Sequence, residues 1–259
     1  MTGRPMASTA LRPRSATEIV DAAFQILRAH YGQFVMCSAL AFMPWLIIQL
    51  VFLGDPQRLV DANPLVTIVA LFGLWMTFAL MSAVIVTCAS QAYLGDTVDV
   101  AVAVRRAVPR LPRVMIVAFL RYFLLFLGFL CLLVGALYVA ARFFALMPSV
   151  ILEDASVGHA FSRSSALSRG RKLHILNTLG LVAIIYWAIA IGIMAVAAFI
   201  GNNVIQAVAG AVYTMLVYPV IAITECLLYY DARIQSEGLD IELMTRELGA
   251  APATDLAGR

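Results

Sequence analysis

Long apolar runs, separated by short polar segments, make up most of this chain. Four of the runs are almost free of charged residues and reach the length of about 20 residues that a helix needs to cross a membrane. They cover residues 34–53, 65–94, 173–200 and 204–230. Turn-forming residues join the members of each pair, at 54–64 and at 201–203. We predict that each run is one transmembrane helix and that each pair forms a hairpin.

A fifth apolar stretch, residues 114–153, is too long for one span and barely long enough for two. Basic residues lie on both of its flanks: Arg105, Arg106, Arg110 and Arg113 before it, and Arg163, Arg169, Arg171 and Lys172 after it. Because basic loops stay on the cytoplasmic side, the stretch should cross the membrane an even number of times. We predict a helix over 114–134, a turn near Gly135 and a short span over 137–152, with Arg142 extending towards the outer face. A single kinked helix is the alternative.

The polar segments before the three hairpins have a helical periodicity. The first begins at Ser15, where a glutamate three residues later completes a capping-box pattern. The second covers residues 97–108, and Pro109 and Pro112 are expected to end it. The third begins near Ser156, with Asp154 or Ser156 as its helix cap. Since each segment has a narrow apolar stripe next to a span, we predict three amphipathic helices at the cytoplasmic interface.

The same unit, an interfacial helix followed by a transmembrane hairpin, therefore occurs three times. A repeat is one interpretation, and the other is that any amphipathic segment before a span would look alike. The pattern predicts an all-α, polytopic membrane helical bundle with six transmembrane helices and three interfacial amphipathic helices. Residues 1–14 should be a disordered, uncleaved cytoplasmic segment, 15–230 the transmembrane domain, and 231–259 a cytoplasmic tail that is helical at its start.

Composition supports a membrane protein, because 63% of the residues are hydrophobic and only 13% are charged, with a mean hydropathy of +0.92. The net charge of +3 comes from basic residues between the apolar runs, so nucleic acid is not an expected partner. All four cysteines lie inside apolar runs without a CxxC spacing, which indicates neither a disulfide framework nor a zinc site. They are Cys37, Cys88, Cys131 and Cys226.

Sequence motifs for catalysis are missing. The chain contains no HExxH, GxSxG, phosphate-binding or dinucleotide-binding motif. His30 and His159 lie on predicted interfacial helices and His174 opens a span, and in these places a boundary role is more common than metal or haem binding. We therefore predict no catalytic residue, no metal and no cofactor, and expect a protein that is not an enzyme.

Two charged residues do lie inside predicted spans. Arg121 and Glu225 each lie roughly 8 to 10 Å from the cytoplasmic end of their helices, at about 1.5 Å per residue. Charge at this depth is costly and is usually paired or functional. We predict an ion pair that ties the third span to the sixth. A proton or substrate relay is the alternative.

Two stretches resemble a bacterial family, the membrane domain of glycerophosphoryl diester phosphodiesterases with its related stand-alone six-span proteins. The first is similar to the Ala-x-x-Arg-Ser helix of that family and the second to its closing segment. The candidate motif residues are Ala160, Arg163, Ser164, Tyr230, Asp231, Arg233 and Gly238. The resemblance implies a six-helix module that accompanies or regulates other proteins. The catalytic domain fused to some relatives is not present in this sequence, so its activity is not expected.

These observations favour a non-enzymatic protein of the bacterial inner membrane, with both termini cytoplasmic. It would act as a scaffold, assembly or regulatory partner for envelope proteins or lipids. A small-solute or lipid transporter or channel is the alternative, favoured if the bundle holds a polar cavity that reaches the middle of the membrane. Expected partners are membrane lipids, and other membrane proteins or a second copy of the chain.

Overall fold

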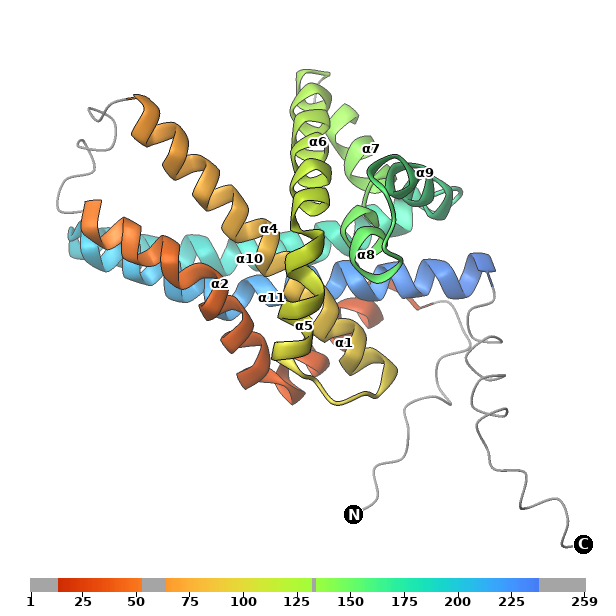
Figure 1. Ribbon diagram of the computed structural model, residues 1–259, viewed down its shortest axis with the longest axis horizontal. Coiled ribbons are helices and arrows are strands. Elements are labelled where there is room, and N and C mark those ends of the chain that lie inside the picture. Colours follow the sequence, from red (N-terminus) through yellow and green to blue (C-terminus); the bar gives the residue numbers. More distant parts are fainter. Residues whose placement is uncertain (1–13, 53–63, 132–133, 238–259) are drawn as a thin grey trace, which may run out of the picture.

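The computed structural model describes residues 14–52, 64–131 and 134–237, and within these ranges the chain is helical without a strand (Figure 1). The elements are α1 (Ala16–Ala29), α2 (Tyr31–Phe52), α4 (Pro64–Leu94), α5 (Val100–Ala107), the 3₁₀ turn η2 (Val108–Arg110), α6 (Leu111–Leu130), α7 (Val134–Arg142), α8 (Leu146–Leu152), α9 (Val157–Leu167), α10 (Lys172–Ile200) and α11 (Asn203–Glu237). The all-α fold is as predicted. The segments 1–13, 53–63 and 238–259, with most of the predicted first turn and tail, lie outside the described residues.

Five helical stretches of the described chain are long and apolar enough to cross a membrane, and α2 contributes a shorter apolar stretch, Tyr31–Met43. The five are Leu71–Leu94, Val100–Leu130, Val134–Leu152, Lys172–Ile200 and Asn203–Glu237. The order of elements follows the predicted unit. A short helix (α1, α5 or α9) precedes each apolar hairpin, formed by α2 with α4, by α6 with α7 and α8, and by α10 with α11.

The first amphipathic helix, α1, has the predicted capping box. The Glu18 amide donates to Ser15 Oγ at 3.3 Å, and the Ser15 amide donates to Glu18 Oε2 at 2.8 Å, so both groups satisfy backbone donors at the helix start. The buried face of α1 packs against α10 and α11. It consists of Ile19, Val20, Ala23, Ile26 and Leu27.

The central apolar stretch is a hairpin, as predicted, in which α6 and α7 pack together. Its two glycines allow a close approach: a Cβ atom at Gly128 would lie 2.6 Å from the Ala136 amide nitrogen, and one at Gly135 would lie 2.6 Å from the Gly128 carbonyl oxygen. The predicted turn position was wrong. Gly135 lies inside α7, which begins at Val134, and α6 ends at Leu130.

The second crossing is a short apolar stretch, Val134–Leu152, as predicted. It contains a break that was not predicted, because the helix ends at Arg142 and resumes at Leu146. The second amphipathic helix also ends where the prolines predict, because α5 stops at Ala107, before Pro109 in η2. Pro112 lies in the first turn of α6, where a missing N–H costs no hydrogen bond.

The buried core lies where the short helices gather on α4 and α11. All residues of α11 from Pro219 to Ala232 except Ile221 are buried, and so are Leu146 to Ile151 of α8. Figure 1 shows the α6–α7 hairpin, α4 and the α2, α10 and α11 group extending from this region in different directions. Their outer parts leave large apolar side chains exposed, such as Phe129 and Phe199, which is the surface expected of helices in contact with lipid.

Candidate functional site

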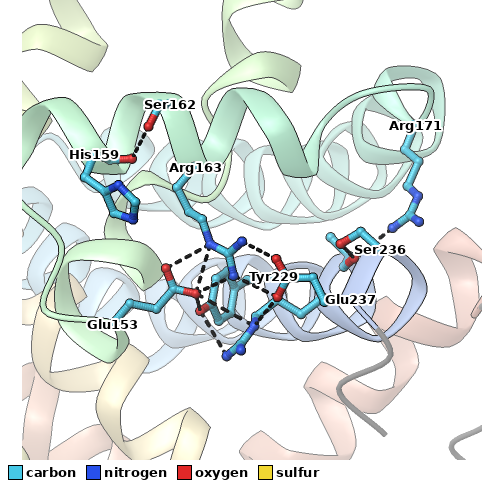
Figure 2. Close-up of polar contacts among 10 residues, drawn as sticks. Glu153, His159, Ser162, Arg163, Arg171, Tyr229, Ser236 and Glu237 are labelled. Atoms are coloured by element: carbon cyan, nitrogen blue, oxygen red, sulfur yellow. Dashed lines mark hydrogen bonds and ion pairs between the residues drawn. The ribbon is translucent and has the colours of Figure 1, made fainter. Parts of the chain in front are cut away.

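Five polar side chains form a cluster, which we call the polar junction: Glu153, Arg163, Tyr229, Arg233 and Glu237. Figure 2 shows how Glu153, Arg163, Tyr229 and Glu237 point toward one another. Glu153 follows α8 directly, Arg163 lies on α9, and the other three lie on the last turns of α11. The junction therefore connects the end of the second hairpin to the short helix and the long closing helix of the third unit.

Arg163 lies at the centre of the polar junction, between two carboxylates. Its Nη2 atom lies 2.7 Å from Glu153 Oε1, and its Nε atom lies 2.9 Å from Glu153 Oε2. Its Nη2 atom also donates to Glu237 Oε2 at 2.8 Å, and its Nη1 atom contacts the second oxygen of Glu237. A guanidinium group that binds two carboxylates in this forked way fixes their orientation as well as their charge.

Glu153 accepts two further contacts. The Tyr229 hydroxyl donates to Glu153 Oε1 at 2.6 Å, and Arg233 Nε lies 3.7 Å from the same oxygen. Partial burial acts to raise the pKa of Glu153, but the hydrogen bonds from Arg163 and Tyr229 and the nearby positive charges outweigh it and lower this pKa below its usual value. Glu153 is therefore held ionised in the folded protein.

Ser164, next to Arg163, explains the break between α7 and α8. Its hydroxyl donates to the Arg142 carbonyl at 3.1 Å and accepts from the Ala145 amide at 3.0 Å. These two backbone groups flank the break, and Ser164 is fully buried. Ala160, one helical turn earlier, is also fully buried. In the Ala-x-x-Arg-Ser pattern, Ala160 is thus buried in the core, Arg163 binds the carboxylates, and Ser164 pairs with the two backbone groups at the break.

The closing segment positions two further motif residues. The Tyr230 hydroxyl lies 2.6 Å from Ser90 Oγ on α4, and its ring stacks on Tyr93 with centroids 4.7 Å apart. Asp231 Oδ1 accepts from the Arg14 amide at 3.3 Å. The start of the described chain therefore lies beside the end of α11. Gly238, the last motif residue, lies outside the described residues.

Asp154 extends the charged contacts to the second unit. Its Oδ1 atom lies 2.9 Å from Arg110 Nε and 2.6 Å from Arg113 Nη2.

Sequence reasoning included Arg163 and Arg233 but missed Glu153 and Tyr229 as partners. The signal was present, because Glu153 is the last residue of the stretch 114–153 and lies at the end of a predicted span, where a charged side chain usually has a partner.

The predicted contact between Arg121 and Glu225 is present. Arg121 Nη2 lies 2.7 Å from Glu225 Oε1 and joins α6 to α11, with the side chains 16% and 9% exposed. The prediction for Arg142 was wrong. Its Nε atom donates to Ser165 Oγ at 3.1 Å, so the side chain reaches α9 near the polar junction instead of the opposite face.

A cavity of about 470 Å³ lies between α2, α4, α10 and α11, away from the polar junction. Aromatic side chains form one wall and amide or hydroxyl groups another. The lining residues are Phe42, Trp45, Leu74, Phe78, Met194, Asn203, Gln206, Ala207, Gly210, Ala211 and Thr214. The distance along α11 from Asn203 to Thr214 is about 16 Å at 1.5 Å per residue, so the cavity lies along roughly the first third of this helix.

Within the described residues, no group of three or more His, Cys, Asp or Glu side chains could hold a metal ion. The carboxylates of the polar junction are bound by arginines instead. Chemically, the arrangement can fix the ends of three helices relative to one another.

No protein-family model, no curated protein and no solved structure matches the chain.

Proposed function

We propose that this protein is a non-enzymatic scaffold, assembly or regulatory partner for envelope proteins or lipids. The observation that carries the proposal is the polar junction. Its charged groups are used to fix α9 and α11 to the end of α8, as the Arg163 contacts with Glu153 and Glu237 show. A rigid, charged end with short amphipathic helices around it is suited to present a surface to a partner.

We further propose that the chain lies in the bacterial inner membrane with the polar junction and both termini in the cytoplasm. The basic residues at this end of the helices support this orientation through the positive-inside rule. The resemblance to the membrane domain of glycerophosphoryl diester phosphodiesterases supports an accompanying or regulatory role. Its two motif stretches are those that meet in the polar junction.

Co-purification tests this proposal. The full-length protein is isolated from native membranes in a mild detergent, and the proteins and lipids bound to it are identified and quantified. A photo-reactive residue at Ser162, on the exposed face of α9, reports contacts at the proposed surface, and one at Ile184, exposed on α10, is the matched control. We expect one protein or lipid class at a fixed ratio that crosslinks at position 162 and not at 184. Isolation of the protein without any such companion would contradict the proposal.

A transporter or channel is the second candidate, and the cavity beside α11 favours it. Thr214, at the inner part of its lining, provides the test. In a protein without its native cysteines, Thr214→Cys should stay unlabelled by a membrane-impermeant thiol reagent if the cavity is filled by lipid or closed. Labelling from the side of Asn203 would show a water-filled path to mid-membrane and would favour transport.

A further inference from the structure

Two cations on neighbouring helices, Lys172 on α10 and Arg142 on α7, lie close together. Lys172 Nζ lies 4.2 Å from the centre of the Tyr138 ring, and the Arg142 guanidinium lies 5.8 Å from the same centre. Among the described residues, no carboxylate forms an ion pair with either cation. In contrast, Arg113, Arg121 and Arg163 each contact a carboxylate. Two like charges held on one ring repel each other unless an anion lies between them.

The hydrogen-bond donors of this site are only partly used. Arg142 Nη1 donates to the Tyr138 hydroxyl at 2.9 Å, and Arg142 Nε donates to Ser165 Oγ at 3.1 Å. Both hydroxyls accept in these contacts and keep their own protons free to donate. Arg142, Ser165 and Lys172 are half-buried. An anion at this site would therefore contact the charges of Arg142 and Lys172 and the hydroxyl donors of Tyr138 and Ser165. The contacts with Arg142 already fix the positions of both hydroxyls.

The start of α10 adds to the positive potential. Lys172 is its first residue, and no side chain caps this end of the 29-residue helix. The free N–H groups and the helix dipole at such an end favour a negative charge.

The exposed apolar residues around the site indicate which kind of anion binds there. Tyr138 is 44% exposed on α7, and the apolar side chains of Leu137 and Leu173 beside the site are also exposed, the latter to 74%. Both belong to helical stretches that can cross a membrane. A site with basic groups at the helix ends and apolar groups further along matches a phospholipid, whose phosphate and acyl chains lie in that order.

We propose that Arg142, Ser165 and Lys172, with Tyr138 as their platform, form a binding site for the phosphate of an anionic phospholipid. The lipid headgroup neutralises the two cations, and its acyl chain lies against the exposed apolar side chains of Leu137 and Leu173. The break after α7 is part of this site, because it ends the helix at Arg142 and directs the side chain to α9. The inference is independent of the scaffold role, since a transporter could carry the same site.

Native mass spectrometry of the full-length protein in detergent tests the site, with phosphatidylglycerol, phosphatidylcholine and inorganic phosphate as the probes. The double variant Arg142→Gln with Lys172→Gln removes both charges. The matched control is Arg105→Gln with Arg106→Gln, which removes two charges from α5. We expect wild type and control to bind phosphatidylglycerol more tightly than phosphatidylcholine. The double variant should bind it about 25-fold less tightly, because each basic residue contributes roughly fivefold near an anionic lipid.

Three results would overturn the proposal. They are equal phosphatidylglycerol binding by wild type and double variant, an equal loss in the control, and displacement of the lipid by millimolar inorganic phosphate, which would indicate a site for free anions. If the double variant does not fold, a second variant still tests the site. Ser165→Ala keeps both charges and removes one donor, and it should weaken phosphatidylglycerol binding several-fold while phosphatidylcholine binding is unchanged. An unchanged affinity of Ser165→Ala for phosphatidylglycerol would contradict the proposed role of Ser165 in phosphate binding.

Discussion

Arg121 on α6 and Glu225 on α11 form a largely buried ion pair, with 2.7 Å between Nη2 and Oε1. The two residues are far apart in the sequence and join the second hairpin to the closing helix. A charge left alone among apolar helices is costly, so each residue depends on the other.

A double-mutant cycle measures this dependence. Glu225→Gln should lower the free energy of unfolding in detergent by about 3 kcal/mol, because it leaves the Arg121 guanidinium without its counter-charge. Replacing both residues by leucine should be better tolerated than either single leucine change. Additive effects, with a coupling below about 0.5 kcal/mol, would mean that the residues act independently. Unchanged stability with lost biological function in both single variants would instead favour a relay and the transporter.

The sequence predicted this pair because depth along a helix can be counted from the end of an apolar run. The same counting located the spans and the three hairpins. The capping rules located the start of α1 at Ser15 and left Asp154 and Ser156 as candidate caps of α9, of which Ser156 is the cap. These features depend on residues that are close together in the chain, or only on how deep a residue lies in the membrane.

Features that depend on distant contacts could not be predicted. The break between α7 and α8 contains Phe143, Phe144 and Ala145. Pro148, in the first turn of α8, cannot donate to the Phe144 carbonyl and is the only local signal for the break. The break is stabilised by Ser164, whose position opposite it exists only in the folded bundle. Arg142 was misplaced for the same reason, because its partner Ser165 lies on α9.

Ser164→Ala should weaken this arrangement. The change removes both hydrogen bonds and leaves the Arg142 carbonyl and the Ala145 amide unpaired in a buried place, at a cost of about 1 to 3 kcal/mol. Thermal unfolding in detergent measures the loss. Ser162→Ala is the matched control, because that serine is exposed and lies on the same helix. Equal stability of the two variants would show that Ser164 does not hold the break.

The polar junction should make stability depend on pH. The pKa of Glu153 is lowered in the folded protein, so the folded state binds fewer protons than the unfolded state at pH values between this pKa and the ordinary glutamate value of about 4.3. The stabilisation is therefore complete above the ordinary value and is lost as the pH falls through the lowered one. Unfolding curves of wild type and Glu153→Gln, measured between about pH 3 and pH 6, should differ at the upper end and converge at the lower end. A constant difference would exclude Glu153 as the titrating group.

The close approach in the central hairpin leads to a glycine prediction. Gly128→Ala places a methyl group 2.6 Å from the Ala136 amide nitrogen, and backbone must move to make room, at a cost of about 1 to 3 kcal/mol. Gly180→Ala is the control, since a Cβ atom there meets nothing within 4 Å and alanine favours the helix. The control should be as stable as wild type or slightly more so. A tolerated Gly128→Ala change would mean that α6 and α7 do not approach so closely in the membrane.

The orientation of the bundle can be tested with single cysteines in a protein without Cys37, Cys88, Cys131 and Cys226. Ser162→Cys lies on the exposed face of α9 and Asn203→Cys lies at the exposed start of α11. The two positions are at opposite ends of α10, whose 29 residues extend about 44 Å. A membrane-impermeant maleimide should label position 203 in intact cells and position 162 only after permeabilisation, because the basic residues around α9 favour the cytoplasm. Labelling of position 162 from outside would place the polar junction on the outer side, and would mean that residues 114–153 cross the membrane only once.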